Sequence, residues 1–511
     1  MAYSLAAFFG LALTAVVTVS GAVSGQHSIS QPLPWPVLSV QDFNPTIPYT
    51  EYNAGMFTPV GELGALTASE FTTLAHPAFP RHSVRVKQSH FCDESVRAYT
   101  GYIDVEARHL FFYFFESRGD PDTDDVVFWT NGGPGSSSSY GLFMELGPCR
   151  INGPNATVPF EYSWTEHANV FFIDQPVGVG FSYAEYGESV DNTIDASKDI
   201  AAFIAIFFEH FTKFKGRPLH LAGESYAGRY LPVYASAIYD QNAKLVERGV
   251  APVNLSSVMI GNGGTEWLSL ILSWYDARCA DPIYPPVDDI ATCVYLKQLV
   301  PRCQKRMQAA CIDQFDRIDC AAASNFCWQL GDVYVGENPT RNPYDRARPC
   351  SGAPDDCYPE ISDIQSYLSL PAVQDAIGVD PAVRGNFSIN SWRVSLEFIA
   401  GLDFYSYRAD HYLAALLERG VRVLVYVGSN DFVANWIGND RMTRSLEWTG
   451  NGAFRAQPLR EWFVDGVAAG LTRSGGGLTF ATIADAGHLA PYDQPVRSLA
   501  LANRWLAREE L

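Results

Sequence analysis

Residues 219–228 read LHLAGESYAG, in which four residues typical of a strand are followed by the pattern Gly-x-Ser-x-Gly around Ser225. Small residues on both sides of such a serine permit a sharp, strained turn between a strand and a helix, and this turn exposes the hydroxyl group. The same short pattern also arises by chance, and Ser225 would then be an ordinary serine of a surface turn. The strand-like run before it and the helical pattern after it favour a nucleophile.

Short apolar runs of the same kind occur on both sides of this stretch, and each ends in a turn rich in Gly or Asn. They lie at residues 126–129, 170–173, 257–260, 423–427 and 478–482. Stretches with helical patterns, such as residues 195–213 and 412–418, lie between them. Alternating helices and nearly continuous apolar strands predict an α/β fold, with a mostly parallel central sheet covered by helices on both faces.

A nucleophilic serine needs a base and a group that orients the base. His488 follows the last predicted strand, and Asp431 follows the strand that ends at Val427. His220 is a poorer candidate because it lies within a strand. Functional residues of parallel sheets gather just beyond the carboxyl ends of the strands, where Ser225, Asp431 and His488 all fall. The order Ser, Asp, His along the chain is that of the α/β-hydrolase fold, which we therefore expect here.

The section from residue 265 to 405 breaks the alternation of strands and helices, and it holds eight of the ten cysteines. We interpret it as a disulfide-rich insertion, or lid, above the sheet. The catalytic core would then consist of residues 86–264 and 406–511. Residues 23–85 are rich in Pro, Ser and Thr, and they are expected to form an N-terminal extension that is either a propeptide or an ordered arm.

Several features indicate export from the cytosol. Residues 1–22 are largely apolar and end in small residues, which is typical of a signal peptide, although the absence of Lys and Arg leaves a membrane anchor as the alternative. An even number of cysteines behind such a segment predicts five disulfide bonds; zinc is the alternative, but the sequence has no Cys-x-x-Cys pair. Candidate glycosylation sites occur at Asn155, Asn254 and Asn386.

The net charge of −20 limits the classes of partner. Nucleic acids and anionic lipids bind clusters of Lys and Arg, so a strongly acidic surface repels both. We therefore expect no nucleic-acid partner and no membrane anchor in the mature protein. No pattern in the sequence calls for a cofactor or a metal ion.

Longer motifs add a family resemblance. Residues 129–138 read WTNGGPGSSS and closely resemble the signature Trp-Leu-Asn-Gly-Gly-Pro-Gly-Cys-Ser-Ser of the serine carboxypeptidases. Residues 174–183 (DQPVGVGFSY), the stretch around Ser225 and residues 435–439 (NWIGN) resemble the same family. The resemblance runs from about Tyr99 to the C-terminus. It implies a secreted or vacuolar enzyme that removes C-terminal residues from peptides and proteins through an acyl-enzyme.

The resemblance also implies roles for individual residues. The backbone N–H groups of Gly133 and Tyr226 would form the oxyanion hole. The residues implied to bind the substrate carboxylate are Trp129, Asn131, Gly132, Glu145 and Glu224. Two close glutamates hold one proton more tightly than either alone, so we expect activity to be greatest in mild acid. Without the resemblance, Glu224 would be a spacer and Glu145 an ordinary helix residue.

The cysteine spacing resembles that of the family as well. It implies Cys279–Cys293, Cys303–Cys327, Cys311–Cys320 and Cys350–Cys357, with Cys92–Cys149 as the remaining bond. Two positions depart from the family pattern: Ser136 replaces the usual cysteine of the signature, and Ala434 replaces a free cysteine near the aspartate. The first departure removes the bridge that commonly tethers the signature loop to the insertion in this family. The second predicts low sensitivity to mercurial reagents.

Two other functions are compatible with this scaffold. An acyltransferase would keep Ser225 and its partners, but the intact Asn131, Glu145 and Glu224 argue against it. A non-catalytic binding protein would have no need of the complete set of Ser225, Asp431 and His488.

Overall fold

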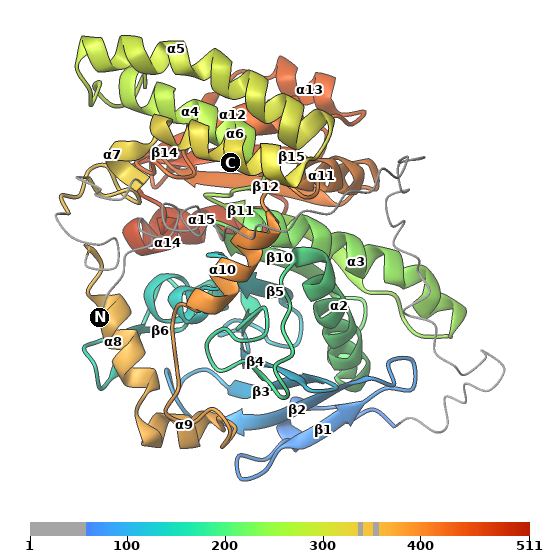
Figure 1. Ribbon diagram of the computed structural model, residues 1–511. Helices are drawn as coiled ribbons and strands as arrows, with labels where there is room; N and C mark the ends of the chain where they lie inside the picture. Colours follow the sequence, from blue (N-terminus) through green and yellow to red (C-terminus); the bar gives the residue numbers. More distant parts are fainter. Residues whose placement is uncertain (1–57, 336–340, 351–356) are drawn as a thin grey trace, which may run out of the picture.

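The computed structural model describes residues 58–335, 341–350 and 357–511. Its centre is a 13-stranded sheet (Figure 1) in which the strands lie in the order β1-β2-β3-β4-β8-β5-β10-β11-β12-β15-β14-β13, with β9 paired to β4. The predicted signal peptide, residues 1–22, lies outside the described residues.

The middle six strands are parallel to one another and carry the site. They are β8 (Ala168–Ile173), β5 (Asp125–Thr130), β10 (Pro218–Glu224), β11 (Asn254–Gly261), β12 (Arg422–Gly428) and β15 (Leu478–Ile483). Each contains one of the six runs that the sequence analysis assigned to strands, so these predictions are confirmed. The runs are mostly apolar because helices cover both faces of this part of the sheet.

The strands on either side of these six are antiparallel. On one side lie β1 (Thr72–Ala75), β2 (His82–Ser89), β3 (Ala98–Val105), β4 (Arg108–Phe115) and the short β9 (Tyr183–Ala184); on the other lie β14 (Val467–Gly475) and β13 (Arg460–Val464). The sheet is therefore mixed, and its parallel character is confined to the centre.

The predicted start of the core at residue 86 falls inside β2. This strand pairs with β3 over its whole length, from His82 to Ser89, and β1 pairs with β2. The sheet thus includes residues that the sequence analysis assigned to the N-terminal extension. Val84 and Val86 are completely buried, which explains why this segment belongs to the core.

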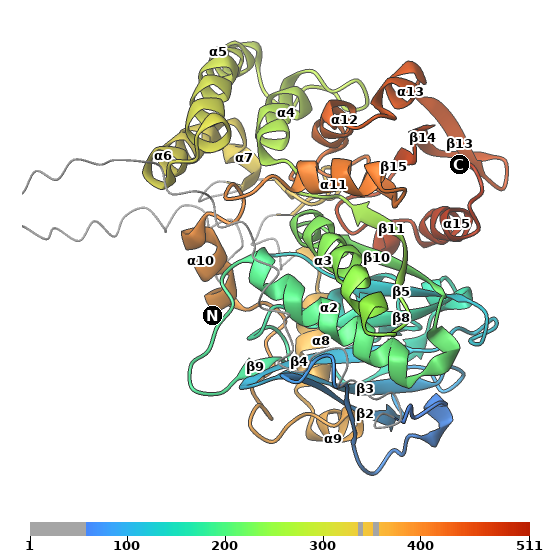
Figure 2. The ribbon, with the colours of Figure 1, turned by 90° about the vertical axis from the view of Figure 1, so that its right-hand side faces the viewer.

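Alternate side chains of each central strand enter two separate cores. In β5, Val126 and Phe128 belong to one core, whereas Val127 and Trp129 belong to the other. The helices α2 (Thr193–His210), α3 (Ala227–Glu247) and α11 (Ala409–Glu418) cover the first face, as Figure 2 shows for α2 and α3. The second face is covered by α8 (Glu360–Leu368), α9 (Pro371–Ile377), α14 (Ala490–Asp493) and α15 (Pro495–Leu506).

The predicted insertion divides into separate groups of helices (Figure 1). The first group is α4 (Trp267–Cys279), α5 (Ile290–Met307), α6 (Arg317–Cys327) and α7 (Asp332–Val335), which stands beside α12 (Trp436–Ser445) and α13 (Asn451–Ala456). The helices α8 and α9 lie far from it, near β6 (Cys149–Ile151) and β3, and α10 (Trp392–Gly401) runs between the two groups. Leu296, Leu299 and Met307 join the core under α2 and α3, so the first group is not an independent domain.

The remaining elements are short. They are β7 (Thr157–Pro159), which pairs with β6, and the 3₁₀- or π-helical turns η5 (Leu63–Ala65), η6 (Gly141–Glu145), η7 (Trp164–Glu166), η8 (Thr212–Phe214), η9 (Gln308–Asp313) and η10 (Trp328–Leu330).

Five disulfide bonds use all ten cysteines. They are Cys92–Cys149, Cys279–Cys293, Cys303–Cys327, Cys311–Cys320 and Cys350–Cys357, the pairs that the resemblance implied. Cys279 and Cys293 lie close to the carboxylate of Asp288, but their bond leaves no thiolate to bind a metal ion there. Among the described residues, no helix combines the length and apolarity needed to cross a bilayer.

Candidate active site

Ser225 lies at a strained turn between β10 and α3. Its φ of 62° is in the left-handed region, which is costly for a residue with a side chain. A Cβ atom at Gly223 would lie 2.2 Å from the carbonyl oxygen of Thr130, and one at Gly228 would lie 2.8 Å from Oγ1 of Thr265. Only glycine fits at these two positions, which accounts physically for the Gly-x-Ser-x-Gly pattern.

His488 and Asp431 meet beyond the carboxyl ends of β15 and β12. His488 Nδ1 lies 2.7 Å from Asp431 Oδ2, and Asp431 is completely buried. The backbone N–H groups of Val433 and Ala434 donate to the same carboxylate at 2.9 and 3.3 Å. Since Asp431 engages Nδ1, the other nitrogen of the imidazole remains to act as a base. His488 and Ser225 line the same cavity.

Asn262 is a further residue of this site, and the sequence analysis missed it. It directly follows β11, with a φ of 43°, and its Nδ2 donates to Asp431 Oδ2 at 2.8 Å. Its Oδ1 accepts from the backbone N–H of Gly428 at 3.1 Å. The rule that identified Asp431, position just beyond a parallel strand, would also have identified Asn262.

Residues 342–348 of the predicted insertion connect the loops of Asp431 and His488. The carbonyl oxygen of Tyr344 accepts from the backbone N–H of His488 at 2.7 Å, and that of Pro343 accepts from Phe432 at 3.2 Å. The buried guanidinium of Arg346 donates to the carbonyl oxygens of Ser429 and Asn430 and pairs with Asp281 at 2.7 Å. No local signal in the sequence indicates this connection.

Glu145 and Glu224 form a buried acid pair around Asn131. Asn131 Nδ2 donates to Glu224 Oε1 at 2.9 Å and to Glu145 Oε1 at 3.3 Å. Its Oδ1 accepts from Trp129 Nε1 at 2.8 Å and from the backbone N–H of Gly141 at 3.0 Å, which fixes the orientation of the amide. Glu224 immediately precedes Ser225 and lines the cavity that contains Ser225 and His488.

Burial raises the pKa of both carboxyl groups of this pair. The pKa of Glu145 is above the ordinary value of a glutamate because the group is removed from water. Burial, the charge of Glu145 and a hydrogen bond to it raise the pKa of Glu224 well above that value. The two groups titrate as a pair, and the shared proton is favoured on Glu224.

The backbone at Gly132 and Gly133 packs against the turn at Ser225. A Cβ atom at Gly132 would lie 2.3 Å from the backbone nitrogen of Tyr226, and Gly133 has a φ of 106°. The backbone of this loop therefore approaches Ser225 and Tyr226 as closely as it can.

Comparison with known families identifies the chain. The family model described as serine carboxypeptidase matches residues 89–508. The chain belongs to the serine carboxypeptidase family. Carboxypeptidase Y of Komagataella phaffii is 37% identical over 437 residues, which cover 84% of this chain and 80% of that protein. Carboxypeptidase Y homolog A of Talaromyces stipitatus is 39% identical over 428 residues, which cover 82% and 74%.

The fold agrees with a solved structure. A prohormone-processing carboxypeptidase from Saccharomyces cerevisiae aligns with a TM-score of 0.69 and 23% identity, covering 82% of this chain and 95% of that chain. The serine carboxypeptidase described here thus has the α/β-hydrolase fold and is a serine-type hydrolase that acts on the C-termini of peptides.

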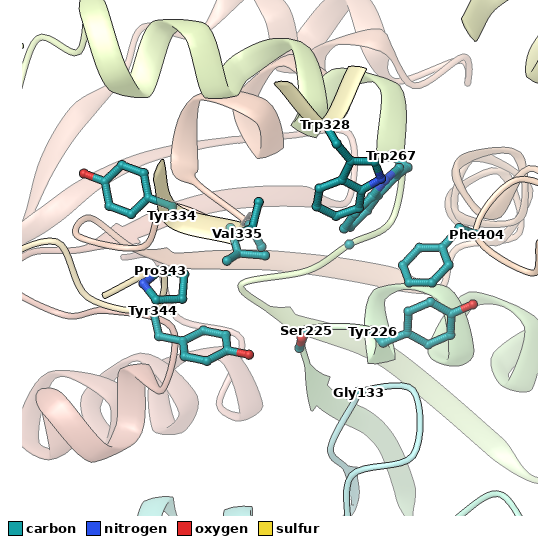
Figure 3. A pocket seen from close by; sticks show the side chains of 13 residues that line it. Gly133, Ser225, Tyr226, Trp267, Trp328, Tyr334, Val335, Pro343, Tyr344 and Phe404 are labelled. Carbon is teal, nitrogen blue, oxygen red and sulfur yellow. The ribbon is translucent and has the colours of Figure 1, made fainter. Parts of the chain in front are cut away.

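Two cavities of this serine carboxypeptidase meet at Ser225. The first is lined by the acid pair's Glu224, together with Asn131 and His488. The second is largely aromatic. Figure 3 shows side chains of the second cavity around Ser225, among them Trp267, Trp328, Phe404, Tyr226, Tyr334 and Tyr344.

Hydrogen bonds tether the signature loop at the position where Ser136 replaces cysteine. Ser136 Oγ donates to Oδ1 of Asn390 at 2.9 Å, and Ser137 N–H donates to the carbonyl oxygen of Ile389 at 2.9 Å. Ser391 N–H donates in turn to the carbonyl oxygen of Gly135 at 2.7 Å. The loop is thus attached to the segment before α10 without a covalent bond.

Proposed function

We propose that Ser225, His488 and Asp431 carry out the peptidase reaction of this serine carboxypeptidase. Ser225 Oγ attacks the carbonyl carbon of the last peptide bond while His488 accepts its proton. Asp431 orients the imidazole and stabilises its protonated form, a role supported by the 2.7 Å contact between them. His488 then gives the proton to the leaving amine, and water hydrolyses the acyl-enzyme with His488 again as base.

The backbone N–H groups of Gly133 and Tyr226 stabilise the oxyanion that forms during each step. The close approach of the Gly132–Gly133 backbone to Tyr226 supports this role. A donor of this kind typically contributes a factor of about 10²–10³ to the rate.

Asn131, Gly132, Glu145 and Glu224 bind the free carboxylate of the substrate, and Trp129 orients Asn131. Below the raised pKa of the acid pair, Glu224 carries a proton and can donate it in a hydrogen bond to that carboxylate. Above that pKa the pair bears two negative charges and repels the substrate. Binding is therefore strongest in mildly acidic solution.

One observation carries this assignment: the buried pair of Glu145 and Glu224 is bonded to Asn131 in the cavity that also holds Ser225 and His488. The test compares N-blocked peptides with a free or an amidated C-terminus between pH 4 and 8, with Ser225→Ala as the inactive control. We expect efficient cleavage of the free form alone, with KM rising with pH. Equal cleavage of both forms would exclude a carboxylate-binding role for the pair.

The aromatic cavity on the other side of Ser225 binds the residue before the scissile bond. Its walls include Trp267, Trp328 and Phe404, and burying apolar surface against them is favourable. We expect kcat/KM to be higher for Phe or Leu than for Ser or Asp at this substrate position. A Trp328→Ala variant should reduce this preference, and an unchanged preference would exclude the cavity as the binding site.

We further propose that the protein acts in the secretory pathway, either outside the cell or in a vacuole-like compartment. Its five disulfide bonds require an oxidising environment, and Asn155, Asn254 and Asn386 are all exposed for glycosylation. Treatment of the native protein with an N-glycosidase should lower its apparent mass, and an unchanged mass would exclude glycosylation.

A further inference from the structure

Arg150 lies in β6, outside the residues that line the substrate cavity, and no step of the proposed reaction uses it. Its Nη2 donates to the backbone oxygen of Glu145 at 3.0 Å and to that of Pro491 at 3.3 Å. The guanidinium carbon lies 3.9 Å from the centre of the Phe160 ring. These contacts fix a positive charge beside Glu145.

The charge of Arg150 is not cancelled by a direct partner. Within the described parts of the chain, Arg150 forms no ion pair, and its buried Nε has no hydrogen-bond partner. Burial lowers the pKa of Arg150 to about 10, so the group stays charged in neutral and acidic solution. A charge held in this way acts strongly on nearby carboxyl groups, because little water screens it.

Glu145 interacts with both Arg150 and Glu224. Its Oε2 is buried and has no hydrogen-bond partner among the described residues. A carboxylate in this position can remain ionised only if a positive charge lies close to it. Arg150 supplies that charge to Glu145, whereas the charged groups that act most on Glu224 are the negative Glu145 and Asp431.

Other titratable groups surround the pair and Arg150. Those that interact with them electrostatically are Asp431, His488, Tyr426, Tyr492, Glu360 and Asp493. The charge of Asp431 raises the pKa of Glu224, whereas Arg150 and His488 both lower the pKa of Glu145. Glu360, Tyr492 and Asp493 act on Arg150 itself.

We propose that Arg150 keeps Glu145 negatively charged, which leaves the proton of the acid pair on Glu224 and sets the pH at which the substrate carboxylate is no longer bound. This inference rests on the proposed function of the acid pair. Arg150 is thus a positioning residue. It acts on substrate binding only by determining which glutamate of the pair carries the proton.

The test measures KM for an N-blocked dipeptide between pH 4 and 9 in Arg150→Gln. Without the positive charge, the pair should keep its proton to a higher pH, so the midpoint of the rise in KM should move upward by about one pH unit. Arg150→Met, which keeps an apolar stem over Phe160, should give the same shift. Arg150→Lys restores the charge and should return the midpoint towards that of the wild type.

Arg118→Gln is a matched control for lost packing. Arg118 also bonds backbone carbonyls next to β6, those of Pro148 and Phe160, but its ion-pair partners are Asp93 and Glu166. We expect the KM of Arg118→Gln to rise with pH at the same midpoint as the KM of the wild type. A uniform rise in KM in Arg150→Gln without movement of the midpoint, or a downward movement, would overturn the proposal.

Glu224→Gln separates a failure of this inference from a failure of the proposed function. If KM of Glu224→Gln is independent of pH, the pair has its proposed role, and adding Arg150→Gln to it should then produce no shift of a midpoint. If KM of Glu224→Gln rises with pH as in the wild type, the proposed function of the pair fails first. A flat profile in Glu224→Gln with no shift in Arg150→Gln would refute only the role of Arg150.

Discussion

Asn262 Nδ2 donates to Asp431 Oδ2 at 2.8 Å, and this is the oxygen that lies 2.7 Å from His488 Nδ1. Asn262 thereby fixes the position of the Asp431 carboxylate, which in turn orients the imidazole of His488. We predict that Asn262→Ala lowers kcat by about tenfold or more, because a hydrogen bond to a charged group typically contributes about 1.5–3 kcal/mol. KM should change little. Asn254→Ala, an exposed change at the other end of β11, is the control, and equal kcat in both variants would contradict this role.

Glu224→Gln should remove the pH dependence of KM while catalysis continues. The raised pKa of the pair means that the wild type loses its proton as the pH rises, and KM rises with that loss. Glutamine cannot lose a proton in this range, so its hydrogen bond to the substrate persists at every pH. The measurement is KM and kcat from pH 4 to 8. A KM that still climbs in the variant would refute proton sharing between Glu145 and Glu224.

The wild-type protein should resist mercurial reagents, because none of its ten cysteines is free. Ala434 lines the aromatic cavity and donates its backbone N–H to Asp431, so a thiol at this position would lie beside the reacting groups. We therefore predict that Ala434→Cys is active and becomes inhibited by an organomercurial. Ala453→Cys, on the exposed surface of α13, should bind the reagent without loss of activity. Inhibition of the wild type would contradict the prediction.

Stability should decrease as the pH rises through about 6. Burial raises the pKa of Asp174 and of Asp493 to about 6, whereas an aspartate in the unfolded chain has a pKa of about 3.9. The folded state binds these protons more tightly than the unfolded state. Their contribution to the free energy of unfolding is therefore complete below about pH 4 and is lost as the pH rises through about 6.

Asp174→Asn tests this dependence, because an amide does not titrate. Each shifted group changes the free energy of unfolding by about 2–3 kcal/mol across this range. The melting temperature of the wild type should fall from pH 4 to 7 more steeply than that of Asp174→Asn. Asp313→Asn, an exposed change in η9, should follow the wild type. If the melting temperature fell equally steeply with pH in all three proteins, Asp174 would not be a source of the pH dependence.

The sequence was sufficient for those parts of the fold in which local pattern and burial agree. Runs such as residues 423–427 are apolar throughout and short, so they could be recognised as strands of a covered parallel sheet. The strand β2 was missed because only Val84 and Val86 mark its buried face, in a segment otherwise rich in polar residues. Antiparallel strands in which apolar and polar residues alternate in this way give a weaker signal than apolar runs.

The residues of the candidate site likewise divide into those that a local pattern predicts and those that depend on the path of the chain. Ser225, Asp431 and His488 follow strands, and their positions relative to one another come from the sheet. The contacts of Tyr344 and Arg346 depend on the path of the chain through the insertion, which no local pattern specifies. The effect of Arg150 depends on burial and on the absence of a paired carboxylate among the described residues, and neither property is visible in a linear sequence.

The bonds from residues 342–348 to both the Asp431 and His488 loops limit how members of this family can be recombined. A chimera that exchanges the helices α4–α7 for those of a relative, in order to change selectivity, would keep the catalytic loops supported only if this short segment stayed with its own core. The crossover points for such an exchange therefore lie before Asn342, and not at the end of the insertion.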